Sequence, residues 1–238
     1  MKKILAGACL VCAASLIKAD IIADWTFEVN TPADLSNNQD ITGIAADVGS
    51  GTASGHHASV ASDWTTPLGN GSANSLSVNN WGVGDYFQFR ITTAGYNSIT
   101  LRWDQTSSST GPGNFNLQYS LDGTTFTTFA TRAVLENGGS PNSDWSGTTA
   151  SSAYNLSADL SSVTAINNQS SVYFRLTDAN TTTPSGGTVA GTGTDRVDNF
   201  TITAVPEPVT WASIVFGTVF GAVQLVQLYR RRVAAAVC

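Results

Sequence analysis

Cysteine is scarce in this chain and is confined to its ends. The 238 residues contain Cys9, Cys12 and Cys238, so the body from Asp20 to Pro208 has none. Without thiols this body can form neither a disulfide nor a thiolate metal site. Its stability must therefore come from burial of a hydrophobic core, and a chain of about 185 residues is long enough to bury one.

Lysine is absent from the same body. Seventeen acids face only five arginines there, which gives a net charge of −12; the arginines are Arg90, Arg102, Arg132, Arg175 and Arg196. A surface of this sign repels nucleic acid and anionic lipid headgroups, so we expect neither as a partner. The charge could collect divalent cations such as calcium, but solubility alone explains it and is the interpretation we prefer.

Recognisable catalytic patterns are missing as well. The only histidines, His56 and His57, are adjacent, and adjacent residues of an extended strand point to opposite faces rather than toward one metal ion. No zinc-protease motif, nucleophile elbow or Ser-His-Asp signature occurs. Glycoside hydrolysis needs two carboxylates about 5 to 9.5 Å apart, and Asp24 with Glu28 is only a weak pair. We expect no enzymatic activity, with an extracellular hydrolase as the least favoured alternative.

The C-terminal region, by contrast, holds a long apolar run. Residues Val209 to Tyr229 contain no charge, and as a helix they would span about 31 Å, close to the thickness of a bilayer core. Three arginines, Arg230, Arg231 and Arg232, follow directly. Such a cluster stays on the cytoplasmic side of a membrane. The pattern predicts a transmembrane helix over 209–229 with the body outside the cytoplasm.

The N-terminal region has the pattern of a secretory signal. Lys2 and Lys3 form a basic start, Ile4 to Ile17 is uncharged and apolar, and Ala19 offers a small residue before a cleavage site. Fourteen apolar residues are too few to cross a bilayer as a helix. We therefore predict a cleaved signal peptide over residues 1–19, with Asp20 as the new N-terminus.

A four-residue motif precedes the C-terminal apolar run. Val205, Pro206, Glu207 and Pro208, the apolar span and the arginine cluster stand in the order of the PEP-CTERM sorting signal of bacterial surface proteins, which this segment resembles. The resemblance implies recognition by exosortase, a membrane-embedded processing enzyme. It also implies removal of the segment 205–238 during export and delivery of the domain 20–204 to the cell surface or extracellular matrix. There we expect the domain to associate with extracellular polysaccharide.

The body itself shows the period-two alternation of β-strands. Apolar residues alternate with polar ones in several stretches: Ala23 to Val29, Phe87 to Ile91, Ile99 to Trp103, Phe115 to Leu121, Val172 to Leu176, and Phe200 to Ile202. Segments rich in Gly, Ser, Thr and Asn, such as Ser36 to Ser62, are expected to be loops. Seven or eight such strands predict an all-β fold, a jelly-roll-like β-sandwich, in which each sheet buries one face and exposes the other. The body also loosely resembles the jelly-roll ectodomains of PEP-CTERM proteins.

Two groups of residues are candidates for binding. Trp64, Trp81 and Trp145 lie in polar, glycine-flanked segments, where they could serve as platforms for sugars or as plugs at the ends of the core, and we prefer plugs. Asp195, Asp198 and Asn199 could hold calcium, although Arg196 among them favours an ion pair. The functional hypotheses are an exported structural or interaction protein, a carbohydrate-binding module with a defined glycan, and, least favoured, the hydrolase.

Overall fold

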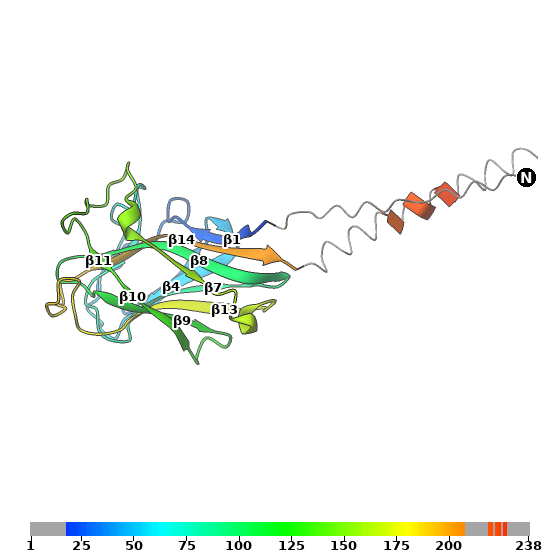
Figure 1. Ribbon diagram of the computed structural model, residues 1–238. Helices are drawn as coiled ribbons and strands as arrows, with labels where there is room; N and C mark the ends of the chain where they lie inside the picture. The colour runs from blue at the N-terminus through cyan, green and yellow to red at the C-terminus, as the bar shows by residue number, and fades with distance from the viewer. Residues whose placement is uncertain (1–17, 208–218, 221, 225, 228–238) are drawn as a thin grey trace, which may run out of the picture.

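The protein is described here from a computed structural model, which describes residues 18–207, 219–220, 222–224, 226 and 227. Its body consists of two β-sheets packed face to face (Figure 1), which confirms the predicted all-β sandwich. The strands in chain order are β1 (Asp20–Trp25), β2 (Asp40–Ala45), β3 (Val48–Gly49), β4 (Gly51–His56), β5 (Trp64–Thr65), β6 (Leu76–Val78), β7 (Tyr86–Ile91), β8 (Tyr96–Ser107), β9 (Asn114–Ser120), β10 (Thr127–Ala133), β11 (Leu135–Glu136), β12 (Asn155–Asp159), β13 (Val172–Asp178) and β14 (Asp195–Pro206). Two short 3₁₀ helices, η1 (Ser152–Tyr154) and η2 (Thr164–Ile166), lie on either side of β12.

The two sheets have different strand orders. One runs β11-β8-β14-β1-β3, with β12 paired to β8, and with β6 joining β14 to the short β5. The other, hereafter the six-stranded sheet, runs β10-β9-β13-β7-β4-β2. Every pairing between strands is antiparallel except that of β11 with β8. Antiparallel sheets of this kind can bury one face and leave the other in water.

Aromatic rings join the two sheets across the core. Phe89 of β7 and Phe200 of β14 stack with ring centroids 3.6 Å apart, and Trp25 of β1 meets Phe89 edge-on at 5.1 Å. All three are fully buried. Offset or edge-on ring pairs stabilise a core beyond the gain from burial itself. The expected inward positions of β7, β8, β13 and β14 are confirmed by their burial.

The first strand is shorter than its alternation predicts. It ends at Trp25, and Phe27, although buried, has φ = +58°, a left-handed conformation that ends an extended chain. The carboxylate of Asp47 accepts hydrogen bonds from the backbone N–H groups of Thr26 and Asn30, which fixes the turn. Val29 is consequently 78% exposed, so its predicted place on the core face is wrong.

The prediction of a loop over Ser36 to Ser62 is also wrong, because this segment contains β2, β3 and β4. Small residues occur in this segment because large side chains from other strands pack against its backbone. A Cβ added at Gly51 would lie 2.7 Å from the ring of Trp25, and one at Gly55 would overlap the ring of Trp64. Glycine in a strand often marks such a close approach. The two indole rings therefore occupy space that β4 leaves free.

The last strand extends into the predicted sorting motif. Val205 and Pro206 pair with Asn97 and Tyr96 of β8, and the N–H of Glu207 donates to the carbonyl of Gly95 at 2.8 Å. Asp20 pairs with Ala204, so the first and last strands begin and end at the same end of the sandwich (Figure 1). The sheet thus contains the first half of the motif.

The remaining terminal predictions fall largely outside the described residues. These are the signal peptide up to residue 17, Pro208, most of the helix 209–229, and the cluster Arg230, Arg231 and Arg232. The described residues between 219 and 227 are helical. Within the described part of the chain, no helix is both long and apolar enough to span a bilayer.

Candidate functional site

The three candidate tryptophans pack inward. Trp64 is fully buried, Trp81 is 7% exposed and Trp145 is 5% exposed. The indole N–H of Trp64 donates to the carbonyl of Asn38 at 3.0 Å, and that of Trp81 to the carbonyl of Val78 at 2.9 Å. Trp145 meets Tyr154 edge-on. A ring this buried cannot stack on a sugar. Trp64 and Trp81 belong to the hydrophobic core and act as plugs, the preferred of the two expectations, whereas Trp145 is buried beside Tyr154 and is not among the core residues.

His57 packs between two of these rings. Its imidazole lies 4.3 Å from the ring of Trp81 and 5.1 Å from that of Trp64, and burial lowers its pKa to about 4. The Nδ1 atom lies 3.1 Å from Ser62 Oγ and 3.6 Å from a carboxylate oxygen of Asp85. A catalytic triad uses opposite ring nitrogens for these two partners. The cluster is buried and lacks the geometry for nucleophilic chemistry.

The predicted calcium cluster does not converge. Asp195 points into the core, where it accepts hydrogen bonds from Gln105 and Ser107, and burial raises its pKa well above the usual range. Arg196 points to the other side of β14 and donates to the carbonyl of Leu68. Among the described residues, the preferred ion pair of Arg196 with these acids is not formed. Asp195, its neighbour in the strand, faces the opposite way, and Asp198 accepts from Ser72 and Asn70 instead.

Asp198 instead faces a second acid. It lies directly opposite Asp104 of β8 in the sheet, and both side chains are buried. Asp198 accepts hydrogen bonds from Ser72 Oγ at 2.6 Å and from the backbone N–H of Asn70 at 2.9 Å. The side-chain amides of Asn70, Asn155 and Asn199 all donate to Asp104. Among the residues in the described ranges, no three His, Cys, Asp or Glu side chains group as they would to hold a metal ion.

Burial disfavours two charges on this facing pair, so we expect the pair to take up a proton near neutral pH unless a cation neutralises it. Two like charges opposite each other in a sheet destabilise it, and removal from water disfavours a carboxylate further. Burial raises the pKa of Asp198 to about 7, and the charge of Asp104 adds to the rise. The hydrogen bonds described above are all donated to carboxylate oxygens of the pair, so those on Asp198 lower its pKa in opposition to burial, and the network serves the fold.

The exposed side of the six-stranded sheet carries a different kind of surface. Its outward side chains alternate with buried core residues along β7 and along most of β4, β9 and β13, and Thr177 at the end of β13 is itself nearly buried. We call this surface the polar face; its residues are Asp40 of β2, Thr52, Ser54 and His56 of β4, Tyr86, Gln88 and Arg90 of β7, Tyr173, Arg175 and Thr177 of β13, Asn116 and Gln118 of β9, and Thr128 and Thr131 of β10.

A row of amide, hydroxyl and guanidinium side chains crosses the middle of the polar face in two hydrogen-bonded groups. Arg175 Nε donates to Gln88 Oε1 at 2.8 Å, and Gln118 Nε2 donates to Thr128 Oγ1 at 3.1 Å. Thr177 Oγ1 donates to Gln118 Oε1 at 2.9 Å. Because side chains held in such a network lose little further freedom on binding, they are well suited to contact a polar ligand.

Planar groups flank this row. The guanidinium of Arg175 lies 3.6 Å from the ring centroid of Tyr86 and 3.7 Å from that of Phe126. Arg90 lies 5.5 Å from the centroid of Tyr173, and His56 is held by Asp40 through a 2.7 Å contact. Burial among the rings lowers the pKa of Arg175, although an arginine stays protonated at neutral pH. The polar face thus combines flat groups with amides and hydroxyls.

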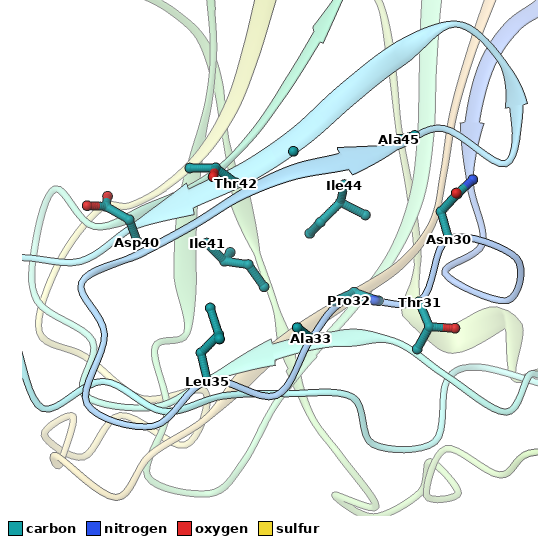
Figure 2. A pocket seen from close by; sticks show the side chains of 11 residues that line it. Asn30, Thr31, Pro32, Ala33, Leu35, Asp40, Ile41, Thr42, Ile44 and Ala45 are labelled. Atoms are coloured by element: carbon teal, nitrogen blue, oxygen red, sulfur yellow. The ribbon is translucent and has the colours of Figure 1, made fainter.

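Two hollows adjoin the polar face. One of 260 Å³ lies beside Arg90 and is lined mainly by hydroxyl-bearing side chains: Ser50, Thr52, Thr92 and Ser170. The other, of 340 Å³, runs along β2 (Figure 2), where Ile41 and Ile44 point toward the segment that carries Pro32 and Leu35. Its floor is aliphatic, and the amide of Asn30 at its end is already bonded to Asp47 and to a backbone carbonyl. The hollow beside Arg90 is the better candidate for a polar ligand.

The alternation over Phe87 to Ile91 implies that Gln88 and Arg90 face solvent, but it indicates no function for them. The candidate platforms of the sequence are tryptophans in glycine-rich segments, which the structure buries. A usable signal was present: tyrosine and arginine, rather than serine or threonine, occupy outward positions of strands such as 86–91 and 172–178. The adjacency of Arg175 to Tyr86 and Phe126 follows only from the pairing of β13 with its neighbours.

No family model matches the chain, and no curated protein sequence matches it. Several solved structures are similar to it. The xylanase Xyn10B of Clostridium thermocellum, solved as its CBM22-1 and GH10 modules with xylohexaose, is 17% identical, with a TM-score of 0.44; the match covers 77% of this chain and 28% of that chain. The CBM22-2 xylan-binding domain of Xyn10C from Paenibacillus barcinonensis is 14% identical over 77% of this chain and 99% of its own, with a TM-score of 0.40. The K1 cleaved adhesin domain of Lys-gingipain from Porphyromonas gingivalis is 11% identical over 77% of this chain and 97% of its own, with a TM-score of 0.39. Similarity at this level does not indicate what this chain binds.

Proposed function

We propose that the protein is an exported surface protein whose sandwich binds an extracellular polysaccharide through the polar face. The observation that carries this proposal is that one sheet combines flat groups with two hydrogen-bonded groups of amide and hydroxyl side chains. The flat groups are Tyr86, Arg175 and Tyr173, and the amides are Gln88 and Gln118. Sugars present apolar C–H faces that pack on flat groups and hydroxyls that bond to amides and hydroxyls. Few other ligand classes need both over an open sheet surface.

A binding role fits the polar face better than a hydrolytic one. Glycoside hydrolysis needs two carboxylates on either side of the bond to be cleaved. Of the residues that make up the polar face, only Asp40 carries a carboxylate, and it contacts His56. The arrangement supports holding a glycan without cleaving it.

Export and tethering form the second part of the proposal. We propose that residues 1–19 direct secretion, that the helix 209–229 anchors the chain, and that an exosortase-type enzyme recognises Val205 to Pro208. After processing, the sandwich would be released to the cell surface or matrix, where polysaccharide is present.

Binding can be tested with the full-length chain in a nonionic detergent by affinity electrophoresis in gels that contain a single polysaccharide. We expect retardation by at least one plant or bacterial polysaccharide, and we expect Tyr86→Ala with Gln88→Ala to abolish it. Arg102→Gln is the matched control, since Arg102 is exposed on the other sheet. Retardation that survives the double substitution would place binding elsewhere, and the absence of retardation across neutral, uronate-containing and sulfated polymers would refute the proposal.

A further inference from the structure

The arginines of this acidic body do not pair with its acids. Within residues 18–207, the only cation–carboxylate contacts below 4 Å involve His56 and His57. Seventeen acids are present for five arginines in the body, so acidic partners are abundant. An arginine that forms no ion pair with a carboxylate of the protein still has guanidinium N–H donors and an uncompensated charge with which to bind a ligand.

Two of these arginines lie on the polar face. Arg90 is exposed, and its Nε donates to Ser171 Oγ at 2.9 Å. Arg175 uses its Nε for Gln88. Arg90 faces Tyr173 in the sheet, and Arg175 is the next outward residue on the same strand. Such diagonal neighbours lie about 7 to 8 Å apart, so one ligand can contact both.

The acids at the margins of the polar face are already engaged. Asp40 contacts His56. Asp122, in the turn after β9, accepts hydrogen bonds from the backbone N–H groups of Thr124 and Thr125. At physiological ionic strength, charges more than about 8 Å away are largely screened. Arg90 and Arg175 are the arginines of the polar face, whereas Asp40 is the one carboxylate among its residues, so this face is less acidic than the body as a whole.

The hollow beside Arg90 has the lining that a charged sugar would need. One guanidinium and the hydroxyls of Ser50, Thr52, Thr92 and Ser170 surround it, and no acid is among its lining residues. A guanidinium binds a carboxylate through two parallel hydrogen bonds, while hydroxyls can bond to the ring substituents of the same sugar. A neutral sugar would leave the charge of Arg90 unused.

We propose that the polar face selects acidic polysaccharides, those whose sugars carry carboxylate groups. One uronate unit binds with its carboxylate on Arg90 in the hollow, and the neighbouring units lie across Tyr173 and Arg175. This inference rests on the proposed glycan-binding function and adds the class of glycan to it.

Isothermal titration calorimetry of the full-length chain in nonionic detergent tests the proposal. The acidic probe is polygalacturonate, and the neutral polymers are its carboxyl-reduced form and xylan. A sulfated galactan tests whether sulfate can replace carboxylate. We expect tighter binding of polygalacturonate than of either neutral polymer. We also expect Arg90→Gln to weaken binding about tenfold, because one charge-assisted bidentate contact is lost. Binding should weaken further with added salt.

Controls separate this inference from the proposed function. Arg102→Gln removes the same charge from the other sheet and should change nothing. Arg175→Lys keeps the charge of Arg175 but loses its flat shape, and it should weaken binding while Arg175→Gln weakens it more. Equal binding of neutral and acidic polymers, unchanged in Arg90→Gln, would overturn the inference and leave glycan binding intact. Preference for the sulfated polymer would overturn the assignment to carboxylates, and no binding of any polymer would refute both proposals.

Discussion

Replacing Asp198 by asparagine tests the buried carboxylate pair directly. In the folded protein the pKa of Asp198 is raised from 3.8 to about 7 by burial. An acid whose pKa is raised on folding contributes most to the free energy of unfolding at low pH. That contribution is lost as the pH rises through its pKa in the folded state. Between about pH 4 and pH 7 the unfolded chain ionises at this residue while the folded chain does not. By pH 8 the folded state is disfavoured by about 4 kcal/mol relative to pH 3.

Asparagine removes this pH dependence but costs a hydrogen bond. Asp198 accepts from the N–H groups of Asn70 and Asn199 and from Ser72. The amide nitrogen of asparagine must replace one accepting oxygen, and an unsatisfied buried donor costs about 1 to 3 kcal/mol. We therefore expect Asp198→Asn to be less stable than the wild type at pH 4 and more stable, by about 1 to 3 kcal/mol, at pH 8.

Urea unfolding followed by tryptophan fluorescence, for both proteins in the same detergent at pH 4 and pH 8, measures this change of sign. An equal loss of stability at both values would refute the protonated pair. Added calcium at pH 8 tests the cation hypothesis in the same experiment. Stabilisation of the wild type and not of the variant would show that a cation, rather than a proton, neutralises Asp104 and Asp198.

Three further predictions concern other parts of the molecule. Burial lowers the pKa of His57 from 6.5 to about 4, so the free energy of unfolding should fall by up to about 3 kcal/mol as the pH falls from 6.5 through 4. His57→Phe should remove this pH dependence from urea unfolding curves. An equally steep dependence in that variant would contradict the assignment. Gly55→Ala should destabilise the sandwich by about 1 to 3 kcal/mol through overpacking against Trp64, while Ser54→Ala on the outward side of the same strand should change the urea midpoint little. Replacement of Arg230, Arg231 and Arg232 by glutamine should impair topology or processing, measured by cell fractionation and intact mass; unchanged surface delivery would count against the sorting proposal.

Much of the core could be predicted from alternation alone. Residues such as Phe87, Phe89 and Leu101 are large and apolar at every second position, and their burial is decided by that local pattern. The strand β4 could not be found in this way. Its apolar content is low because it packs glycine against Trp25 and Trp64, and those contacts come from distant parts of the chain.

The candidate site depends even more on distant contacts. Arg90 and Arg175 lie far apart in the sequence and become neighbours only through the pairing of β7 with β13. The facing of Asp104 and Asp198 likewise follows from the register of β8 and β14. Composition gave the net charge of the body, but it could not show that the arginines avoid the acids.

The place of β14 bears on how the protein would respond to mechanical load. It lies between β8 and β1 and runs antiparallel to both, and its final residues lead directly toward the proposed anchor. Tension between a membrane anchor and a glycan held on the six-stranded sheet would act along the axis of this strand. Such a force loads many interstrand hydrogen bonds in shear at once instead of opening them one by one. The strand that ends the domain is therefore also placed to resist unfolding when the anchored protein is pulled away from the cell.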